Sequence, residues 1–541
     1  EPGGWETHGG TWETAPVQNP DMGANPFSYK VRAEAETATA IAGYPYWDEY
    51  RVTASLRPET PRGQVGVGFY AQDPENMLLF RARVLEGDAP LADGFAFVRR
   101  VDGREQVLAQ SPGGLRPTQW YRVMVKAEGP WIGAFVDGER LFAVRETTFS
   151  GGQIALWAEK TAARFDDVLV EPVTLPLDTG QRLVGTVPAW AGIIDVDSWA
   201  GPATPWEANP EVPGLFWRRG VFYGDVGMRF EIPELPPGGQ AMLLADGDGE
   251  SLESGYTLTL SRNGEGAALI LAHGGRELAR ATLPGAGPLA LSLRKQGTRV
   301  LGLVDDKVVV KAPAAAQAGG GRLAFRAAGF KPRISSIAVW SANVSDYTFD
   351  TAPVDWWVAS GEWDVTNRWS CTPDWSWFGG FSAGVAAIWH KRPFEGNIAL
   401  DFYAGPKMIT LDNERSKEAM ADFNAALCGD GRDVNSGYAF IVAENRTGAR
   451  ILKQGKVVAE NRAFRLFTHG HNRWANIRVE KHGGRLRLFV EGQLTVEYTD
   501  PQPLSGGYAG IWTRNNGIMV PRVTLYHEAL GERLLSLPWR R

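Results

Sequence analysis

The residues best suited to contact a ligand are tryptophans concentrated in one stretch. Seven of the 21 tryptophans lie between Trp356 and Trp389. The segment NRWSCTPDWSWFGGFSAG within this stretch is rich in loop-forming residues, so not every ring there can lie on the buried face of a strand. Exposed rings stack on the C–H faces of sugars while polar neighbours hold the hydroxyls. The sequence therefore predicts a carbohydrate-binding site made of Trp369, Asp374, Trp375, Trp377 and Trp389.

Core packing is the alternative for these rings. We favour it for Trp356 and Trp363, because Trp5 and Trp12 repeat their seven-residue spacing near the start of the chain. A shared spacing indicates a shared structural position rather than a ligand contact.

Acidic loops in two places have the oxygen-rich composition that calcium prefers. They are Asp246, Asp248 and Glu250 in LLADGDGESLESGY, and Asp430, Asp433 and Asn435 in CGDGRDVNSGY. Neither completes an EF-hand, so turn formation by the acidic side chains explains the same pattern. Calcium is the one cofactor to which the sequence points.

Two cysteines, Cys371 and Cys428, lie 57 residues apart in the last third of the chain. A disulfide between them would hold the tryptophan-rich loop against a later insertion, and two buried free thiols are the alternative. The insertion, LDNERSKEAMADFNAALCGDG, places Ala419, Phe423 and Ala426 with Leu427 at helical spacing. It predicts one short helix, begun by Asp412 and ended by Gly429.

The composition of the whole chain indicates which elements position these residues. The 541 residues include 64 Gly and 34 Pro, with few helical patterns, which predicts many short strands and tight turns. One order of strands and turns occurs three times. Its hairpins turn at Asp102-Gly103, Gly274-Gly275 and Gln454-Gly455, and again at Asp137-Gly138, Asp305-Asp306 and Glu491-Gly492.

The repeat predicts an all-β chain of three tandem antiparallel sandwiches with the short helix in the third. Their expected bounds are residues 1–175, 176–345, which looks like a spacer, and 346–530, followed by a tail at 531–541. The first unit lacks a counterpart of the YTFDTAPV segment that opens the third. Its edge is therefore open or is covered by another segment or chain, for which the tail residues Leu534, Leu535, Leu537 and Trp539 are candidates.

The stretch RWANIRVEKHGGRLRLFVEGQLTVEYTD, followed by PLSGGYAGIW and matched in the other two units, resembles the concanavalin A-like lectin and glucanase superfamily. Within it, the units resemble bacterial 3-keto-disaccharide hydrolase-like domains. The resemblance implies laminin G-like jelly rolls, a fold that carries both lectins and glycoside-active enzymes. No Glu-x-Asp-x-x-Glu strand, Gly-x-Ser-x-Gly elbow or nucleotide loop accompanies it. If the unit were catalytic, Asp374, His390, Asp430 and Asp433 would be the available acids and bases.

The formal net charge of −6 and the interspersed charges argue against nucleic acid as a partner. The start at Glu-Pro-Gly rather than Met reads as a processed N-terminus, so we expect a secreted or cell-surface protein, extracellular or periplasmic. Together these features favour a carbohydrate-binding or matrix-associated protein without its own catalysis. The alternatives are a metal-assisted glycoside hydrolase or lyase, and a structural subunit of an extracellular assembly.

Overall fold

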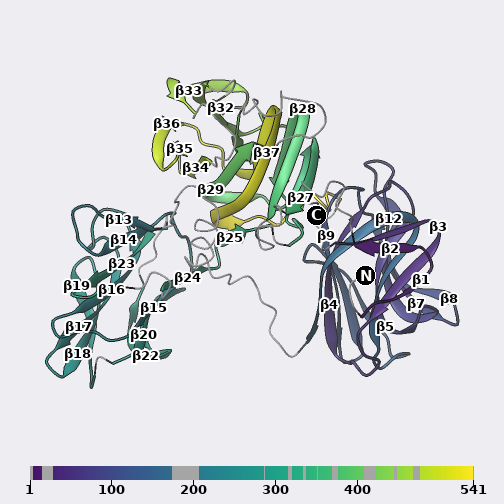
Figure 1. Ribbon diagram of the computed structural model, residues 1–541, viewed down its shortest axis with the longest axis horizontal. Helices are drawn as coiled ribbons and strands as arrows, with labels where there is room; N and C mark the ends of the chain where they lie inside the picture. Colours follow the sequence, from purple (N-terminus) through teal and green to yellow (C-terminus); the bar gives the residue numbers. More distant parts are fainter. Residues whose placement is uncertain are drawn as a thin grey trace.

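The computed structural model describes residues 4–14, 28–173, 206–285, 287–314, 320–332, 337–349, 351–367, 376–406, 422–443, 447–466 and 475–539. Throughout these ranges the regular elements are β-strands, and they form antiparallel sheets in three groups (Figure 1). The predicted all-β sandwich class is confirmed. No helix in the described ranges has the length and apolar character needed to cross a membrane.

The first sandwich is a sheet of 12 strands in which β3 and β12 pair with strands on both sides. Its strands are β1 (Glu6–His8), β2 (Thr11–Thr14), β3 (Tyr29–Ala42), β4 (Tyr50–Pro58), β5 (Gln64–Asp73), β6 (Asn76–Arg83), β7 (Leu91–Val101), β8 (Arg104–Gly113), β9 (Tyr121–Glu128), β10 (Trp131–Val136), β11 (Glu139–Arg145) and β12 (Gln153–Pro172). The path runs β11-β10-β9-β4-β12-β5-β6-β7-β8.

The second sandwich has separate sheets of seven and five strands, ordered β13-β14-β23-β16-β17-β18-β19 and β22-β21-β20-β15-β24. The strands are β13 (Trp206–Ala208), β14 (Leu215–Arg218), β15 (Val226–Ile232), β16 (Gln240–Gly247), β17 (Tyr256–Asn263), β18 (Gly266–His273), β19 (Arg276–Leu283), β20 (Leu289–Gln296), β21 (Arg299–Val304), β22 (Lys307–Pro313), β23 (Arg322–Ala328) and β24 (Ile337–Ser341).

The third sandwich is a 13-stranded sheet built around the long strand β37. Its strands are β25 (Val344–Tyr347), β26 (Trp356–Ser360), β27 (Glu362–Asn367), β28 (Ser376–His390), β29 (Phe394–Pro406), β30 (Asn424–Gly429), β31 (Tyr438–Val442), β32 (Thr447–Lys453), β33 (Lys456–Arg465), β34 (Ala475–His482), β35 (Arg485–Val490), β36 (Gln493–Thr499) and β37 (Gly506–Leu530). The main path runs β33-β32-β31-β30-β37-β29-β34-β35-β36. The sheets thus draw their strands from three successive stretches of chain, while the expected bounds at 175, 345 and 530 stay predictions.

The predicted two-residue turns form, because their residues adopt the left-handed backbone conformation that such hairpins need. Asp137 and Gly138, for example, have φ values of 50° and 85°. The same turn is reinforced in each sandwich by its acidic residue, whose carboxylate accepts a backbone N–H from the start of β9, β20 or β34. The pairs are Arg122 N to Asp137 Oδ1 at 2.9 Å, Ala290 N to Asp305 Oδ1 at 2.8 Å, and Asn476 N to Glu491 Oε1 at 2.7 Å.

The paired tryptophans occupy equivalent positions, as their spacing predicts. Trp12 Nε1 donates to the Gly9 carbonyl and Trp363 Nε1 to the Ser360 carbonyl, both at 3.1 Å. Trp363 and Trp356 are buried in the core of the third sandwich, so the core assignment for both is confirmed.

The predicted helix is wrong where the structure describes it. Asn424 to Gly429 form β30, an inner strand paired with both β31 and β37. Phe423 and Leu427 are fully buried in the sandwich core and Ala426 lies on the opposite, equally buried face. A strand buried on both faces shows no alternation, which is why its apolar run imitates helical spacing. Asp412 and Ala419 lie outside the described residues.

The first and third sandwiches meet in a polar and aromatic interface. Lys391, which follows β28, donates to Asp137 Oδ2 at 2.7 Å and to the Trp120 carbonyl at 2.6 Å. The amide of Gln119 makes two hydrogen bonds with the backbone of Val358, both at 3.0 Å. These contacts link stretches more than 200 residues apart in the sequence.

The C-terminal tail covers part of the first sandwich, and Figure 1 shows the end of the chain beside it. Leu534 and Leu537 are buried in the core cluster of the first sandwich, and Leu535 and Trp539 pack against that cluster. The segment is not a strand. The tail residues singled out from the sequence therefore do cover the first unit, within the same chain.

Candidate functional site

Most of the predicted tryptophan site lies outside the described residues. This holds for Trp369, Asp374 and Trp375, and also for Cys371. Trp377 is described and is half-buried at the start of β28. Trp389 is fully buried, among Ala387, Tyr508 and Trp512. Its ring therefore offers no face to a sugar, and the prediction of Trp389 as a binding platform is wrong. In the sequence, a tryptophan of β28 that faces the core looks the same as one that faces solvent.

His390 is also internal, with an exposed fraction of 4%. Its Nε2 lies 3.1 Å from the Tyr347 hydroxyl and its Nδ1 lies 2.9 Å from the Arg392 carbonyl. Burial lowers the pKa of His390, which keeps the ring neutral. These contacts position the ring within the interface rather than at an accessible catalytic centre.

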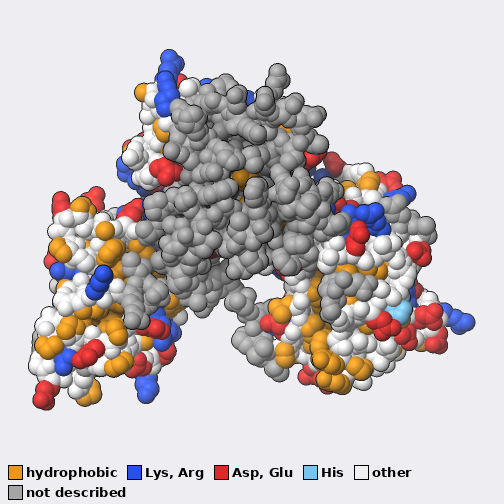
Figure 2. All heavy atoms as spheres, in the orientation of Figure 1, with side chains coloured by type: hydrophobic (Ala, Val, Ile, Leu, Met, Phe, Trp, Pro, Cys, Tyr) orange, Lys and Arg blue, Asp and Glu red, His pale blue; other side chains and the backbone are white. Residues whose placement is uncertain are grey.

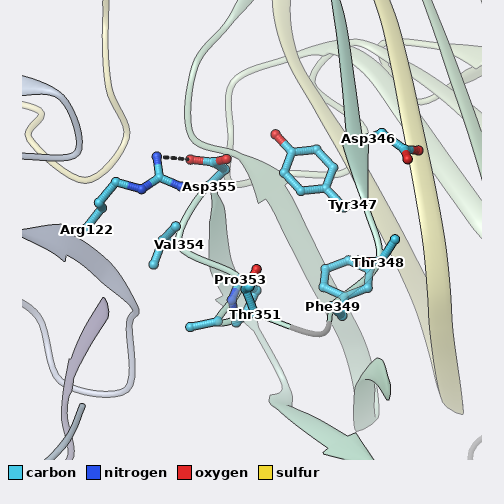
Figure 3. Close-up of a pocket in the computed structure, with 10 residues that line it drawn as sticks. Arg122, Asp346, Tyr347, Thr348, Phe349, Thr351, Pro353, Val354 and Asp355 are labelled. Atoms are coloured by element: carbon cyan, nitrogen blue, oxygen red, sulfur yellow. Dashed lines mark hydrogen bonds and ion pairs between the residues drawn. The ribbon is translucent and has the colours of Figure 1, made fainter. Parts of the chain in front are cut away.

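A crevice of about 380 Å³ lies close to His390, at the seam between the first and third sandwiches. Figure 3 shows Arg122 reaching across it to Asp355, which it contacts at 3.3 Å, with Tyr347 on the same side as Asp355. Most of its wall is the single segment 346–355. Because Arg122 and Asp355 pair across the seam, we assign this crevice to the interface.

The acidic loops are built as matching turns. Asp248 Oδ1 accepts the backbone N–H groups of Glu250 and Ser251, and Asp430 Oδ1 accepts those of Arg432 and Asp433, all at 2.8 Å. Despite the opposing effect of burial, such bonds hold the pKa of Asp248 below its usual value. Asp433 Oδ1 in turn accepts the Asn435 N–H at 2.9 Å.

The remaining predicted calcium residue of the second unit, Asp246, is buried and contacts Lys295 Nζ at 2.5 Å. Across the described ranges, no three His, Cys, Asp or Glu side chains are grouped closely enough to hold a metal ion. The structure thus accounts for these acids through turns and an ion pair, which was the alternative to calcium.

Cys428 is a free cysteine among the described residues, and its predicted disulfide partner, Cys371, lies outside them, so the disulfide stays a prediction. Burial raises the pKa of its thiol to about 11. Its positive φ of 57° matches Asp246 at 59° and Tyr70 at 51°, which stand near the same strand end in the other two sandwiches. Cys428 therefore occupies a repeated backbone irregularity.

His527 makes the stability of the third sandwich pH-dependent. The side chain is 3% exposed, and neither ring nitrogen has a hydrogen-bond partner among the described residues. Burial, with a smaller contribution from His390, lowers its pKa from 6.5 to about 4. The unfolded chain therefore takes up a proton near pH 6.5 that the folded chain refuses until about pH 4, so stability is highest above pH 6.5 and falls as the pH drops through this window.

At about 1.4 kcal/mol per unit of pKa, the loss amounts to about 3 kcal/mol between pH 6.5 and pH 4. Urea midpoints measured across this range should fall for the native chain and fall less for His527→Gln. An equal pH dependence in the two proteins would show that His527 is not the group responsible.

An aromatic loop that the sequence analysis did not select lies between β3 and β4 of the first sandwich. Tyr44 and Tyr46 are 55% and 73% exposed, and their rings stack with centroids 5.3 Å apart and an interplanar angle of 21°. Trp47 meets Tyr44 edge-on at 5.5 Å and Tyr50 at 5.9 Å. We call residues 43–49 the tyrosine loop. Figure 2 shows hydrophobic side chains gathered at the lower end of the first sandwich.

The tyrosine loop is held by its neighbours on β12 and by its own backbone. Gly152 N donates to the Trp47 carbonyl at 2.8 Å, Gln153 Nε2 to the Gly43 carbonyl at 3.1 Å, and Trp47 N to the Tyr44 carbonyl at 3.2 Å. The indole of Trp47 lies directly on Gly43, where an added Cβ would be only 2.1 Å from a ring carbon. A glycine is required there for the close approach and for the φ of 101°.

Beside the loop is a cavity of about 450 Å³ in the first sandwich. Its lining is largely apolar and includes the rings of Trp5, Tyr29 and Trp47, with Asp166 and Asp167 as its acids. Asp167 Oδ2 already accepts hydrogen bonds from Ser55 Oγ at 2.7 Å and Ala352 N at 2.9 Å. An apolar cleft with few polar groups, bordered by exposed rings, is suited to binding rather than to acid–base chemistry.

The signal for this loop was visible in the sequence as AGYPYWDEY. The tryptophan count drew attention to the third unit instead. The overlooked signal was a group of three aromatic residues within four positions, beside a proline. Three such residues cannot all face one core from a strand.

No protein-family model matches the chain, and no curated protein matches it. Among solved structures it is similar to the carbohydrate-binding module CBM66 from Bacillus subtilis, with 19% identity and a TM-score of 0.26 over 31% of this chain and 95% of that one. A Bacillus subtilis protein of unknown function with a galectin-like fold matches at 13% identity and a TM-score of 0.27, over 35% of this chain and 96% of that one. The exoplasmic/lumenal domain of VIP36 in its Ca²⁺/Man2-bound form matches at 8% identity and 0.27, over 35% and 89%.

Proposed function

We propose that this protein is exported and binds carbohydrate through the tyrosine loop of its first sandwich, without catalysis of its own. The observation that carries the proposal is the pair of stacked, solvent-exposed rings of Tyr44 and Tyr46. Exposed apolar side chains are common singly, but two large rings stacked at the surface hold each other in place, and their outer faces provide a flat platform. Sugar rings present flat C–H faces that such a platform matches.

The fixed geometry of the loop supports this proposal. Its backbone is tied to β12, and Trp47 supports Tyr44 from the side, so the platform exists before a ligand arrives. A preorganised platform avoids the entropy cost of ordering side chains on binding. Asp48 and Glu49 are exposed in the same loop and provide acceptors for sugar hydroxyls.

Replacing both tyrosines by alanine should weaken binding to neutral polysaccharides at least about fivefold, since each aromatic contact contributes roughly 0.5–1.5 kcal/mol beyond its buried area. Retention of the purified chain on a polysaccharide panel, with product analysis of the same samples, measures the effect. Trp131→Ala is the matched control, because Trp131 is a 52% exposed ring elsewhere on the first sandwich.

The melting temperature of Tyr44→Ala/Tyr46→Ala should stay close to that of the native chain, since both rings are largely exposed. Unchanged retention of this variant would remove the tyrosine loop from consideration. Trp375→Ala and Trp377→Ala then test the tryptophan stretch of the third unit, which stays a second proposed sugar contact. New reducing ends in the panel would contradict the non-catalytic part of the proposal.

A further inference from the structure

A groove of about 620 Å³ lies where the second and third sandwiches meet. Sequence patterns gave no indication of it, because its walls come from two stretches, 207–322 and 476–492, that are more than 150 residues apart. The two sandwiches touch beside it through Phe222 and Tyr526, whose rings meet edge-on at 5.2 Å. The side chains of Arg219 and Asn476 join across it at 3.4 Å. Its arginines are Arg219, Arg322, Arg478, Arg485 and Arg487.

On the side of the second sandwich, two arginines share one carboxylate. Glu207 on β13 contacts Arg219 at 3.1 Å and Arg322 at 2.7 Å. Arg322 also donates from Nε to the Arg218 carbonyl at 3.0 Å. Two guanidinium groups on one carboxylate leave one positive charge in excess.

The third sandwich repeats this arrangement on the facing wall. Glu480 on β34 is shared by Arg478 and by Arg487, the latter at 2.5 Å. The Nε atoms of Arg478 and Arg487 are buried and have no hydrogen-bond partner among the described residues. Both guanidinium groups also lie over Phe489, at 6.0 and 5.3 Å from its centroid. The second wall therefore has an excess positive charge and unused donors.

The groove also has charges outside the two arginine pairs. Arg485 is paired with Glu497 at 2.7 Å. Asp248 and Glu250 line the groove as exposed side chains of the acidic turn. Asp401 lies buried behind the wall, where burial raises the pKa of its carboxyl against the opposing effect of Arg478, and Asn476 Nδ2 donates to it at 2.7 Å.

We propose that this groove binds the carboxylate or sulfate group of an acidic saccharide between the two arginine pairs. Guanidinium groups suit this task because their planar donors match the oxygens of such anions. An anion placed there would offset one of the two excess positive charges and bridge two sandwiches. The saccharide part rests on the proposed function, whereas the anion part rests on the groove alone.

The experiment compares binding of the full chain to dextran, dextran sulfate and polygalacturonate, with Arg322→Gln and Arg487→Gln as variants. Each variant should lose about tenfold or more in affinity for the two acidic polymers and none for dextran. Arg280→Gln is the control, because Arg280 is exposed, is not among the residues that line the groove, and is paired with Glu277 as the groove arginines are paired with theirs. Glu207→Gln should bind the acidic polymers more tightly, which a merely structural role for these pairs does not predict.

Equal losses for Arg280→Gln and the groove variants, or unchanged affinity in the groove variants, would overturn the proposal. Displacement of dextran sulfate by inorganic sulfate at an equal concentration of sulfate groups would overturn its saccharide part. Failure of the proposed function looks different: dextran would not be retained by the native chain, while binding to the acidic polymers would still depend on Arg322 and Arg487.

Discussion

Replacing Lys391 by Met should lower the free energy of unfolding by about 3–5 kcal/mol, because it leaves a buried carboxylate without its partner. Lys391 is 2% exposed, and its side-chain nitrogen contacts Asp137, the Trp120 carbonyl and the face of Tyr121, 4.6 Å from the ring centroid. Burial lowers the pKa of this lysine, and the attraction of Asp137 opposes that effect. In the native contact, the buried charge of Lys391 and that of Asp137 therefore stabilise each other. Urea unfolding of Lys391→Met and of the native chain measures the loss.

A double variant separates the ion pair from simple packing. Asp137→Asn alone should also destabilise strongly, whereas Lys391→Met combined with Asp137→Asn should recover part of the loss, since no charge is then left uncompensated and Asn tolerates the positive φ of this turn. Lys126→Ala is the matched control, because the Lys126–Glu128 pair at 2.7 Å is solvent-exposed and such pairs contribute little. If Lys391→Met were no more destabilising than Lys126→Ala, the interface would not depend on this pair.

Leu537→Ala should destabilise the first sandwich by about 2–5 kcal/mol, although residue 537 is more than 360 positions away from the end of β12. The side chain is 1% exposed and belongs to the same core cluster as the strands of the first sandwich. Leu535 N donates to the Lys391 carbonyl at 3.0 Å, and the Tyr508 hydroxyl donates to the Arg533 carbonyl at 3.0 Å, which places the tail between the two sandwiches. Thermal unfolding, together with dye binding to exposed apolar surface, measures the effect.

Leu494→Ala provides the comparison, since Leu494 is 51% exposed on β36 and its truncation should change stability little. If Leu537→Ala behaved like Leu494→Ala, the tail would not contribute to the core of the first sandwich. Light scattering on the native chain tests the alternative that the tail is exchanged between copies. A dilution-stable monomer agrees with the tail lying on its own first sandwich.

The repeated strands and turns could be predicted from sequence because each depends on local rules. A two-residue turn needs positive φ at its central residues, which the Asp-Gly and Gln-Gly pairs supply. Apolar residues at alternate positions indicate a strand with one buried face. The helix prediction at residues 424–429 failed because β30 is buried on both faces and so has no alternation to reveal it.

The sites were harder to predict for a different reason. Burial of Trp389 depends on strands β30 and β37 closing over it, with Gly429 and Gly510 making room for the ring. The arginine groove depends on how two sandwiches meet, and Arg322 and Arg487 are far apart in the sequence. Among these sites, only the turns of the acidic loops could be predicted from the local sequence, because their hydrogen-bond donors and acceptors lie within six residues of each other.

The contact between the first and third sandwiches also changes what a break in the chain would do. The second sandwich comes between them in sequence, yet the first is held by Lys391, Gln119 and the tail, and the second is held to the third through Tyr526. A nick between residues 173 and 206 would therefore leave two fragments that remain bound to each other. The polypeptide joins the sandwiches in the order first, second, third, whereas the contacts described here join them in the order first, third, second.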